Sequence, residues 1–394
     1  MGTRQSIRLG MVGGGPGSGI GPAHRYGASM DGAFRLVAGA FSRDPDKNAQ
    51  MGESLGLDPE RVYADFETMA VAEGKLADGI RAVSIVTPND SHVPACLAFI
   101  KQGIHIICDK PLATSFKDAV IAYRAARSRD VIFGLSHVYA CYAMAREARE
   151  RIKAGELGEL RTIQLEYASG SRTRLVESEG DTKAQWRMTP HIAGPSSVLG
   201  DIGTHAHHLA RFITGLELEA VSADIQTMVP GRTGDDNANV NLRFEGGIRG
   251  QLWASFVAAG LGNGLCIRVF GDRGSLEWVQ ERPDELWIRP VSEPQRLLQR
   301  GEAWLSEAAR QASRMKIGHP QGILEAFANF YGDVATAIHG RESGQNPDGQ
   351  QLSFATARDG VLGMKFVEAA VESNANDGGW VDATVDFAVI ERTA

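Results

Sequence analysis

The strongest limit on the fold of this chain comes from a glycine-rich loop near its amino terminus. The apolar run Ile7–Val12 predicts a strand, the loop extends from Gly13 to Gly21, and Pro22 suits the first position of a helix. Glycines allow close backbone approach, so the free N–H groups at the helix start can meet a pyrophosphate. The spacing is GxGxxxG, looser than the common GxGxxG. The residues expected to contact the phosphates are Gly13, Gly15, Gly17, Ser18, Gly19 and Ile20.

Strand-like and helix-like stretches alternate up to about residue 136. The further strands are predicted at Phe34–Phe41, Arg81–Val86, Ile104–Ile107 and Val131–Leu135. Such alternation predicts a parallel sheet covered by helices on both faces, so residues 1–136 should form a dinucleotide-binding domain. In folds of this class the ligand lies at the carboxyl ends of the strands.

Polar residues follow three of these strands. Lys110, held by Pro111 at a strand end, is the first active-site candidate, and the other residues expected to line the cofactor are Thr87, Pro88, Asn89, His92 and Asp109. For His92, a helix-cap or surface role is the alternative. Ser42 and Arg43 follow the second strand, where Arg43 can pair with a 2′-phosphate; alternatively it is a solvated turn residue. Because Asp44 could serve a 2′-hydroxyl instead, we expect dual use of NAD and NADP with some preference for NADP.

The alternation stops in residues 137–394, which are predicted to form an α+β domain. A helix at Tyr142–Ala154 precedes strands close enough for an antiparallel meander, with a polar, helix-prone insertion from Glu293 to Gly318 and helices at Gly322–Ile338 and Gln351–Ser373. The predicted strands are Arg161–Ser169, Glu219–Met228, Asn237–Phe244, Gly247–Phe256, Leu265–Phe270, Ser275–Val279 and Glu285–Ile288.

A second polar cluster opens a predicted helix that runs to about Thr214. In Gly200-Asp201-Ile202-Gly203-Thr204-His205, a spacing of four places Asp201 and His205 on one helix face, with His208 further along it. The alternatives are an acid in the first helical turn and a satisfied core histidine. Because this cluster can face Lys110, the two are interpreted as halves of one site.

The motifs together resemble the Gfo/Idh/MocA oxidoreductases, the glucose–fructose oxidoreductase and inositol dehydrogenase family. The resemblance rests on the glycine loop, Thr87-Pro88-Asn89, Asp109-Lys110-Pro111, 154–158 (AGELG) and 200–205. It implies a Rossmann domain, a second domain with a large open sheet, NAD(H) or NADP(H), a sugar or cyclitol substrate, and a homodimer or homotetramer. Asp109 replaces the family's usual glutamate, and His208 stands where many members have an aspartate, which puts substrate identity in doubt.

The same residues suit oxidation of a secondary alcohol. His205, with a pKa expected near neutrality, can take the hydroxyl proton, Asp201 can orient its imidazole, and Lys110 can stabilise the reacting oxygen. A proton relay through Lys110 or Asp201 with no single base is the rival assignment. A metal site made from Asp201, His205, His207 and His208 is a further reading, but His207 points off the shared face, so no metal is expected.

Substrate contacts are expected on the approach to the catalytic helix. Trp186 could stack on a sugar ring, and Arg187 could bind hydroxyls or a carboxylate; a packed loop with a surface arginine is the alternative. The full set of expected substrate contacts is Lys110, Tyr139, Trp186, Arg187, His191, Asp201, His205 and His208.

Charge and composition exclude other classes of protein. With a net charge of -7 the chain lacks the excess Lys and Arg that nucleic-acid binding needs. No apolar run approaches the length of a membrane span, and four scattered cysteines suggest reduced thiols, so a cytoplasmic protein is expected. The predicted function is NAD(P)-dependent oxidation or reduction of a sugar, sugar derivative or cyclitol. A catalytically silent dinucleotide-binding sensor is the alternative.

Overall fold

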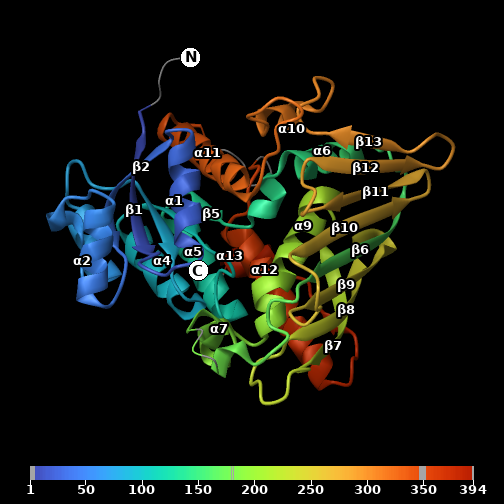
Figure 1. Ribbon diagram of the computed structural model, residues 1–394, viewed down its shortest axis with the longest axis horizontal. Helices are drawn as coiled ribbons and strands as arrows, with labels where there is room; N and C mark the ends of the chain where they lie inside the picture. The colour runs from blue at the N-terminus through green and yellow to red at the C-terminus, as the bar shows by residue number, and fades with distance from the viewer. Residues whose placement is uncertain (1–4, 179, 181, 346–351, 393–394) are drawn as a thin grey trace.

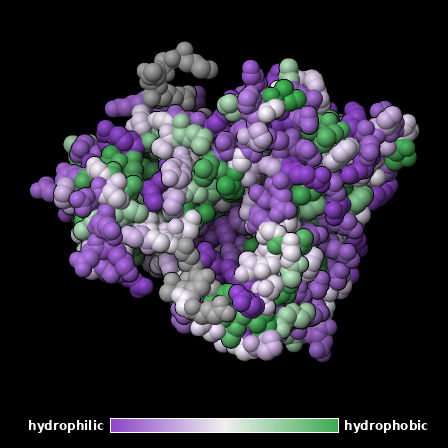
Figure 2. All heavy atoms as spheres, in the orientation of Figure 1, coloured by the Kyte–Doolittle hydropathy of each residue, from purple (hydrophilic) through white to green (hydrophobic). Residues whose placement is uncertain are grey.

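The computed structural model describes residues 5–178, 180, 182–345 and 352–392. Two sheets stand on opposite sides of the molecule, with helices packed between and around them (Figure 1). Between the two halves the surface is hollowed, and hydrophilic residues gather in the hollow (Figure 2). Among the described residues, no helix is both long and apolar enough to cross a membrane.

The first sheet has five parallel strands in the order β2-β1-β3-β4-β5, as the alternating pattern predicts. The central strand β3 is buried along its whole length, as expected for a parallel sheet covered on both faces. The strands are β1 Ile7–Gly13, β2 Phe34–Ala40, β3 Ala82–Val86, β4 His105–Cys108 and β5 Phe133–Leu135. The helices between them are α1 Gly21–Met30, α2 Pro45–Ser54, α3 Phe66–Glu73, α4 His92–Lys101 and α5 Phe116–Ser128.

A helix from the far end of the chain completes one face of this sheet. Helix α11, Ile323–Glu342, packs against α1, and its Phe327, Phe330 and Tyr331 share a core with Ile7 and Phe34 (Figure 1). The domain boundary expected at residue 136 therefore separates the strands of the two sheets. Helix α11 comes after this boundary in the sequence but packs on the first sheet.

The second sheet has nine strands in the order β13-β12-β11-β10-β6-β9-β8-β7-β14. All neighbouring pairs are antiparallel except β6 and β9, so the sheet is mainly antiparallel as expected, but it is not a simple meander. The strands are β6 Leu160–Ala168, β7 Leu218–Gln226, β8 Asn237–Phe244, β9 Arg249–Ser255, β10 Gly264–Gly271, β11 Gly274–Val279, β12 Glu285–Pro290, β13 Arg296–Gln299 and β14 Val381–Asp382.

The polar insertion differs from its predicted helical character. It contains β13, paired with β12, and only a short helix, α10 at Glu307–Gln311. Leu298 of β13 is buried, so burial and pairing with the sheet edge override a helix-prone composition.

Helices of the second half fill the space between the sheets. Helix α12, Ala357–Ala375, packs against both α5 and β7, while α6, Ala143–Lys153, packs against α9, Thr204–Thr214. The short helices α7 Thr182–Arg187 and α8 Pro190–Ala193 precede α9, and α13 Phe387–Arg392 packs on α5 near the end of the chain.

Candidate active site

The glycine loop passes close to the ends of two neighbouring strands. A β-carbon on Gly15 would lie 2.7 Å from the carbonyl oxygen of Phe41, and Gly13 has a φ of 78° beside the carbonyl of Val86. A third close approach falls on Gly21, whose added β-carbon would lie 2.7 Å from the Cα of Gly14. The glycines therefore let the loop pack closely against the strand ends and the start of α1, where free backbone N–H groups can bind a phosphate.

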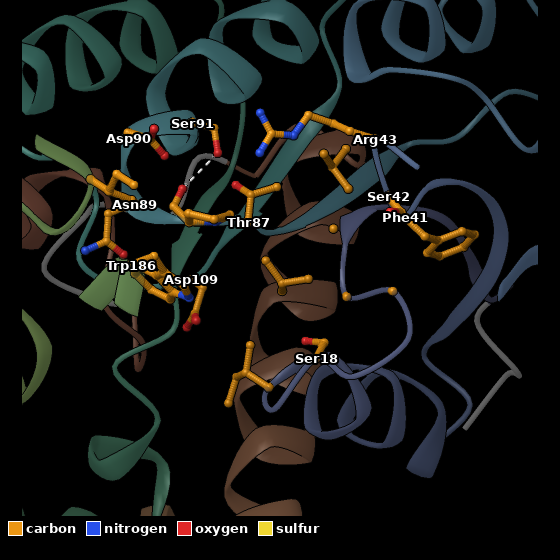
Figure 3. Close-up of a pocket in the computed structure, with 18 of the residues that line it drawn as sticks. Ser18, Phe41, Ser42, Arg43, Thr87, Asn89, Asp90, Ser91, Asp109 and Trp186 are labelled. Carbon is orange, nitrogen blue, oxygen red and sulfur yellow. Dashed lines mark hydrogen bonds between the residues drawn. The ribbon is translucent and has the colours of Figure 1, made fainter. Parts of the chain in front are cut away.

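The loop forms one wall of a cavity of about 770 Å³, which is large enough for a dinucleotide. Figure 3 shows side chains from the glycine loop, the end of β2 and the turn after β3 around this space. The expected cofactor-binding residues that line it are Gly13, Gly15, Gly17, Ser18, Gly19, Ile20, Ser42, Arg43, Thr87, Pro88, Asn89, Asp109 and Lys110. We conclude that these residues fit a nicotinamide dinucleotide.

His92 differs from its predicted place along the cofactor. It is fully buried, and its ring nitrogens contact the carbonyl oxygens of Pro111 at 2.7 Å and Thr87 at 2.9 Å. Burial lowers the pKa of His92, and a neutral ring donates from one nitrogen only, so one of the two contacts is a hydrogen bond near neutral pH. His92 thus braces the turn after β3 against the Lys110-Pro111 turn, instead of facing the cavity.

After the end of β2, Arg43 and Asp44 are the two residues that could bind the adenine ribose, and their surroundings differ. The carboxylate of Asp44 accepts hydrogen bonds from the backbone N–H groups of Asp46 and Lys47, at 3.1 and 3.2 Å, and so caps helix α2. The exposed Arg43 side chain lines the cavity. Asp44 is therefore engaged by its own helix, whereas Arg43 is available to the cofactor.

Asp109 sits at the base of the site as an anion. Its Oδ1 accepts a hydrogen bond from Ser136 and lies 3.7 Å from Nε2 of the buried His24, a residue that sequence reasoning missed. Burial alone would raise the pKa of Asp109, but His24 and Lys110 hold it well below the ordinary value.

Lys110 and Asp201 meet across the two halves of the molecule. The Lys110 Nζ lies 2.8 Å from Oδ1 of Asp201 and 2.6 Å from the Asp201 carbonyl oxygen. That carbonyl belongs to a π-helical turn, Leu199–Gly203, which precedes α9 and is a common feature of functional sites. The structure thereby brings together the two predicted clusters.

Asp201 does not orient the imidazole of His205 as the sequence suggested. Its Oδ2 accepts a hydrogen bond from Arg172 at 3.0 Å and lies 3.7 Å from Nε of Arg187. The π-helical turn breaks the alignment of residues four apart that a regular helix would give. Burial opposes the charge of Asp201, but Lys110, Arg172 and Arg187 hold its pKa well below the ordinary value.

His205 is buried beside this ion pair, and a second histidine contacts it. Nδ1 of His205 lies 3.2 Å from Nδ1 of His137, and the two rings meet edge to face. Burial, followed by the charge of Lys110, lowers the pKa of His205 well below the ordinary histidine value. Sequence reasoning missed His137, although its position two residues after β5, at the carboxyl edge of the sheet, was a usable signal.

The expected substrate contacts are distributed around this centre. Trp186 and Arg187 of α7 line the cavity, and the ring of Tyr139 packs edge to face against His205. His191 on α8 is exposed. His208 differs from its expected role, because it is buried behind His137, stacked on that ring at a centroid distance of 4.7 Å.

A series of hydrogen-bonded polar side chains, which the sequence did not predict, begins at Tyr139. Its hydroxyl lies 2.7 Å from that of Tyr167, which donates to Asn263 at 2.8 Å, and Asn263 donates to Gln280 at 2.7 Å. Tyr167 is the last residue but one of β6 and Asn263 precedes β10, so only strand pairing brings them together. Within the described part of the chain, no group of three or more His, Cys, Asp or Glu residues is arranged to hold a metal ion.

Two family descriptions match the chain on either side of the site. The oxidoreductase family with an NAD-binding Rossmann fold matches residues 7–137, and the GFO/IDH/MocA C-terminal domain matches residues 145–277. An uncharacterized oxidoreductase of Bacillus subtilis (strain 168) is 35% identical, over 95% of this chain and 96% of its own. The chain belongs to the GFO/IDH/MocA oxidoreductase family.

Some of the similar proteins have solved structures that contain a nicotinamide cofactor. An inositol dehydrogenase homolog from Azotobacter vinelandii, complexed with NAD+, is 38% identical, covers 96% of this chain and 97% of its own, and has a TM-score of 0.92. A second complex of an inositol dehydrogenase homolog from that organism contains NADH and myo-inositol. A levoglucosan dehydrogenase of Pseudarthrobacter phenanthrenivorans is 27% identical over 96% of this chain and 98% of its own. The predicted family, fold class and nicotinamide cofactor are confirmed.

Proposed function

We propose that this protein transfers a hydride between NAD(P) and a secondary alcohol or ketone of a sugar, sugar derivative or cyclitol. The observation that carries the proposal is the meeting of Lys110 with Asp201 beside His205, at the end of the dinucleotide cavity. The named relatives support the substrate class, because one is a levoglucosan dehydrogenase and another is an inositol dehydrogenase homolog complexed with NADH and myo-inositol. They do not favour the alternative of a silent sensor.

The roles of the residues follow from their contacts. A bound nicotinamide supplies the hydride acceptor or donor. Lys110 donates a hydrogen bond to the reacting oxygen and stabilises its negative charge. Asp201, an anion held by three cationic side chains, fixes the position of Lys110 and does not itself exchange protons near neutral pH.

His205 serves as the base. Its Nε2 has no hydrogen-bond partner among the described residues and is not a fully buried atom, so solvent can reach it. In the oxidative direction Nε2 takes the hydroxyl proton, and in the reductive direction it returns one. Trp186, Arg187 and Tyr139 then provide contacts for the remainder of a hydroxyl-rich substrate.

The direct test is a cofactor-reduction assay over a panel of cyclitols, sugars and anhydrosugars, with NAD+ and NADP+ in parallel. We expect turnover with members of the panel. Tight binding of NAD(P)H without turnover of any compound would contradict the proposal and favour the alternative, a catalytically silent sensor.

Assembly and compartment complete the proposal. We infer a homodimer or homotetramer formed through the open nine-stranded sheet, as the family resemblance implies. We place it in the cytoplasm, because all four cysteines are buried and unpaired. Light scattering of the purified protein tests the assembly, and a monomer at micromolar concentration would contradict it.

A further inference from the structure

We propose that His137 is a positioning residue that fixes the tautomer of His205 and so keeps Nε2 of His205 free to accept the substrate proton. This inference rests on the proposed function. It concerns a residue that the catalytic motifs do not contain, and it follows from the contact between two ring nitrogens.

A hydrogen bond between two neutral imidazoles contains one proton. The Nδ1 atoms of His137 and His205 are 3.2 Å apart, so one ring must donate and the other accept. If His137 donates, the proton of His205 sits on Nε2, which then cannot act as a base. If His205 donates, its Nε2 has a free lone pair. Catalysis by His205 requires the second arrangement.

The surroundings hold the ring of His137 in place. Its ring stacks on His208 at 4.7 Å and 12°, and the backbone N–H of His137 donates to the Leu135 carbonyl at 2.7 Å. His208 in turn stacks on Phe212, and its Nε2 lies 4.0 Å from the carboxylate of Asp359. The ring is therefore fixed in plane and position by its stacking on His208.

Burial is the main reason that His137 stays neutral. The groups that face it are Lys110, His205, His207 and His208, and burial together with these groups lowers its pKa well below the ordinary value. A protonated His137 would have to donate and would impose the inactive tautomer on His205. The groups that face His205 are Lys110, Asp109, Asp201, His208, Tyr139 and Tyr167. Asp201 is engaged by Lys110 and Arg172, so a neutral imidazole occupies the place that a carboxylate takes in other histidine pairs.

Three substitutions separate positioning from packing. His137→Asn keeps an acceptor close to the position of Nδ1, His137→Leu removes it, and His137→Asp adds a negative charge. We expect His137→Leu to lower kcat at least ~10-fold with the Kd for cofactor unchanged, and His137→Asn to recover most of that loss. His137→Asp should move the acid limb of the pH–rate profile to higher pH. Equal losses in the Asn and Leu variants, or an unmoved limb in the Asp variant, would overturn the proposal.

A readout that needs no turnover keeps this test separate from that of the proposed function. In protein labelled with 15N-histidine, long-range proton–nitrogen spectra at neutral pH report which ring nitrogen carries the proton, and the His205 signals are those lost in His205→Gln. We expect the proton of His205 on Nδ1 in the wild type and in His137→Asn, with a change toward Nε2 in His137→Leu. A wild-type proton on Nε2 would overturn the inference, even in an active enzyme. A proton on Nδ1 in a protein without turnover would leave the inference standing and remove the proposed function.

Discussion

At the scale of single residues, the site is organised by one carboxylate. Asp201 lies within 4 Å of Lys110, Arg172 and Arg187, and the hydrogen-bonded pair with Lys110 joins the two halves of the molecule. A buried carboxylate paired with several cations stays ionised, so its role is to hold cationic donors in place. Lys110 is consequently a partner of Asp201, and we propose that it also donates to substrate.

Replacing Lys110 with methionine tests the donor role. We expect Lys110→Met to leave nucleotide binding almost intact and to lower kcat at least ~10²-fold, the scale of a lost transition-state donor. Lys117→Met, at an exposed position on α5, is the matched control and should have no effect on either quantity. Turnover near the wild-type rate in Lys110→Met would disprove the assigned role.

The pH dependence of oxidation tests the base. Because burial and Lys110 lower the pKa of His205, its protonation should reduce kcat only below about 6.5, the ordinary histidine value, so the limb lies on the acid side of the position expected from sequence. The rate should fall as pH falls through this limb. His205→Ala should remove the limb and most of the activity. An unchanged limb in that variant would identify another group as the base.

At the scale of elements, the ends of parallel strands place the cofactor groups. β1 leads into the glycine loop, β2 into Ser42 and Arg43, β3 into Thr87-Pro88-Asn89, and β4 into Asp109-Lys110. His92 ties the turn after β3 to the turn after β4, and the Asn89 amide donates to the Ala193 carbonyl of α8 at 2.9 Å. The cofactor side is thereby connected to the segment that carries the proposed substrate contacts.

The turn after β2 predicts the cofactor preference. Asp44 is engaged in capping α2, and an arginine at this place can make paired contacts to a 2′-phosphate that a hydroxyl cannot reciprocate. We expect dual use with some NADP preference, and Arg43→Ala should lower kcat/KM for NADP more than for NAD. Arg35→Ala, at an exposed position on β2, is the control. An unchanged ratio of the two kcat/KM values would show that Arg43 is a solvated turn residue.

Local sequence patterns predicted most of the elements and missed what depends on distant pairing. Alternation and glycine placement gave all five strands of the first sheet within a few residues, because burial on both faces leaves apolar runs. Strand β13 was missed, since this four-residue stretch is stabilised by pairing with β12 and by burial of Leu298. Lys110, Asp201 and His205 were found at strand and helix ends, whereas Arg172, Tyr167 and Asn263 reach the site through sheet topology that local periodicity does not encode.

At the scale of the whole molecule, helices from the end of the chain bind the halves together. Helix α11 covers the first sheet, and α12 contacts both α5 and β7 (Figure 1). Between these layers lies a group of buried histidines: His137, His205, His207 and His208. Their burial links the stability of the fold to pH.

Acid should destabilise the protein before its carboxylates titrate. Burial is the main cause that lowers the pKa of His207 to about 3 and of His208 to about 4. Since these values lie below the unfolded value near 6.5, the unfolded state binds more protons between about pH 6.5 and 4. The stability that the neutral rings provide is complete above pH 6.5 and is lost as pH falls, by about 1.4 kcal/mol per pH unit for each histidine.

His207 allows this linkage to be measured, since it stacks on Phe366 and is not part of the proposed catalytic group. We expect His207→Leu to reduce the slope of unfolding free energy against pH, measured by denaturant titrations between pH 6.5 and 4.5, by roughly one proton. The absolute unfolding free energy of the His207→Leu variant serves only as the baseline from which its slope is measured. An unchanged slope would show that His207 is not a source of the acid sensitivity.

The central claim is that the two halves form one site for direct hydride transfer, and isotope transfer tests it most directly. The protein is incubated with NAD+ or NADP+ and with an active cyclitol or sugar that carries deuterium on the reacting carbon, and the reduced cofactor is analysed by mass spectrometry. We predict one deuterium per reduced nicotinamide in the wild type, with transfer at least ~10²-fold slower in Lys110→Met. Reduced cofactor without deuterium, or equal transfer by the variant, would contradict the account.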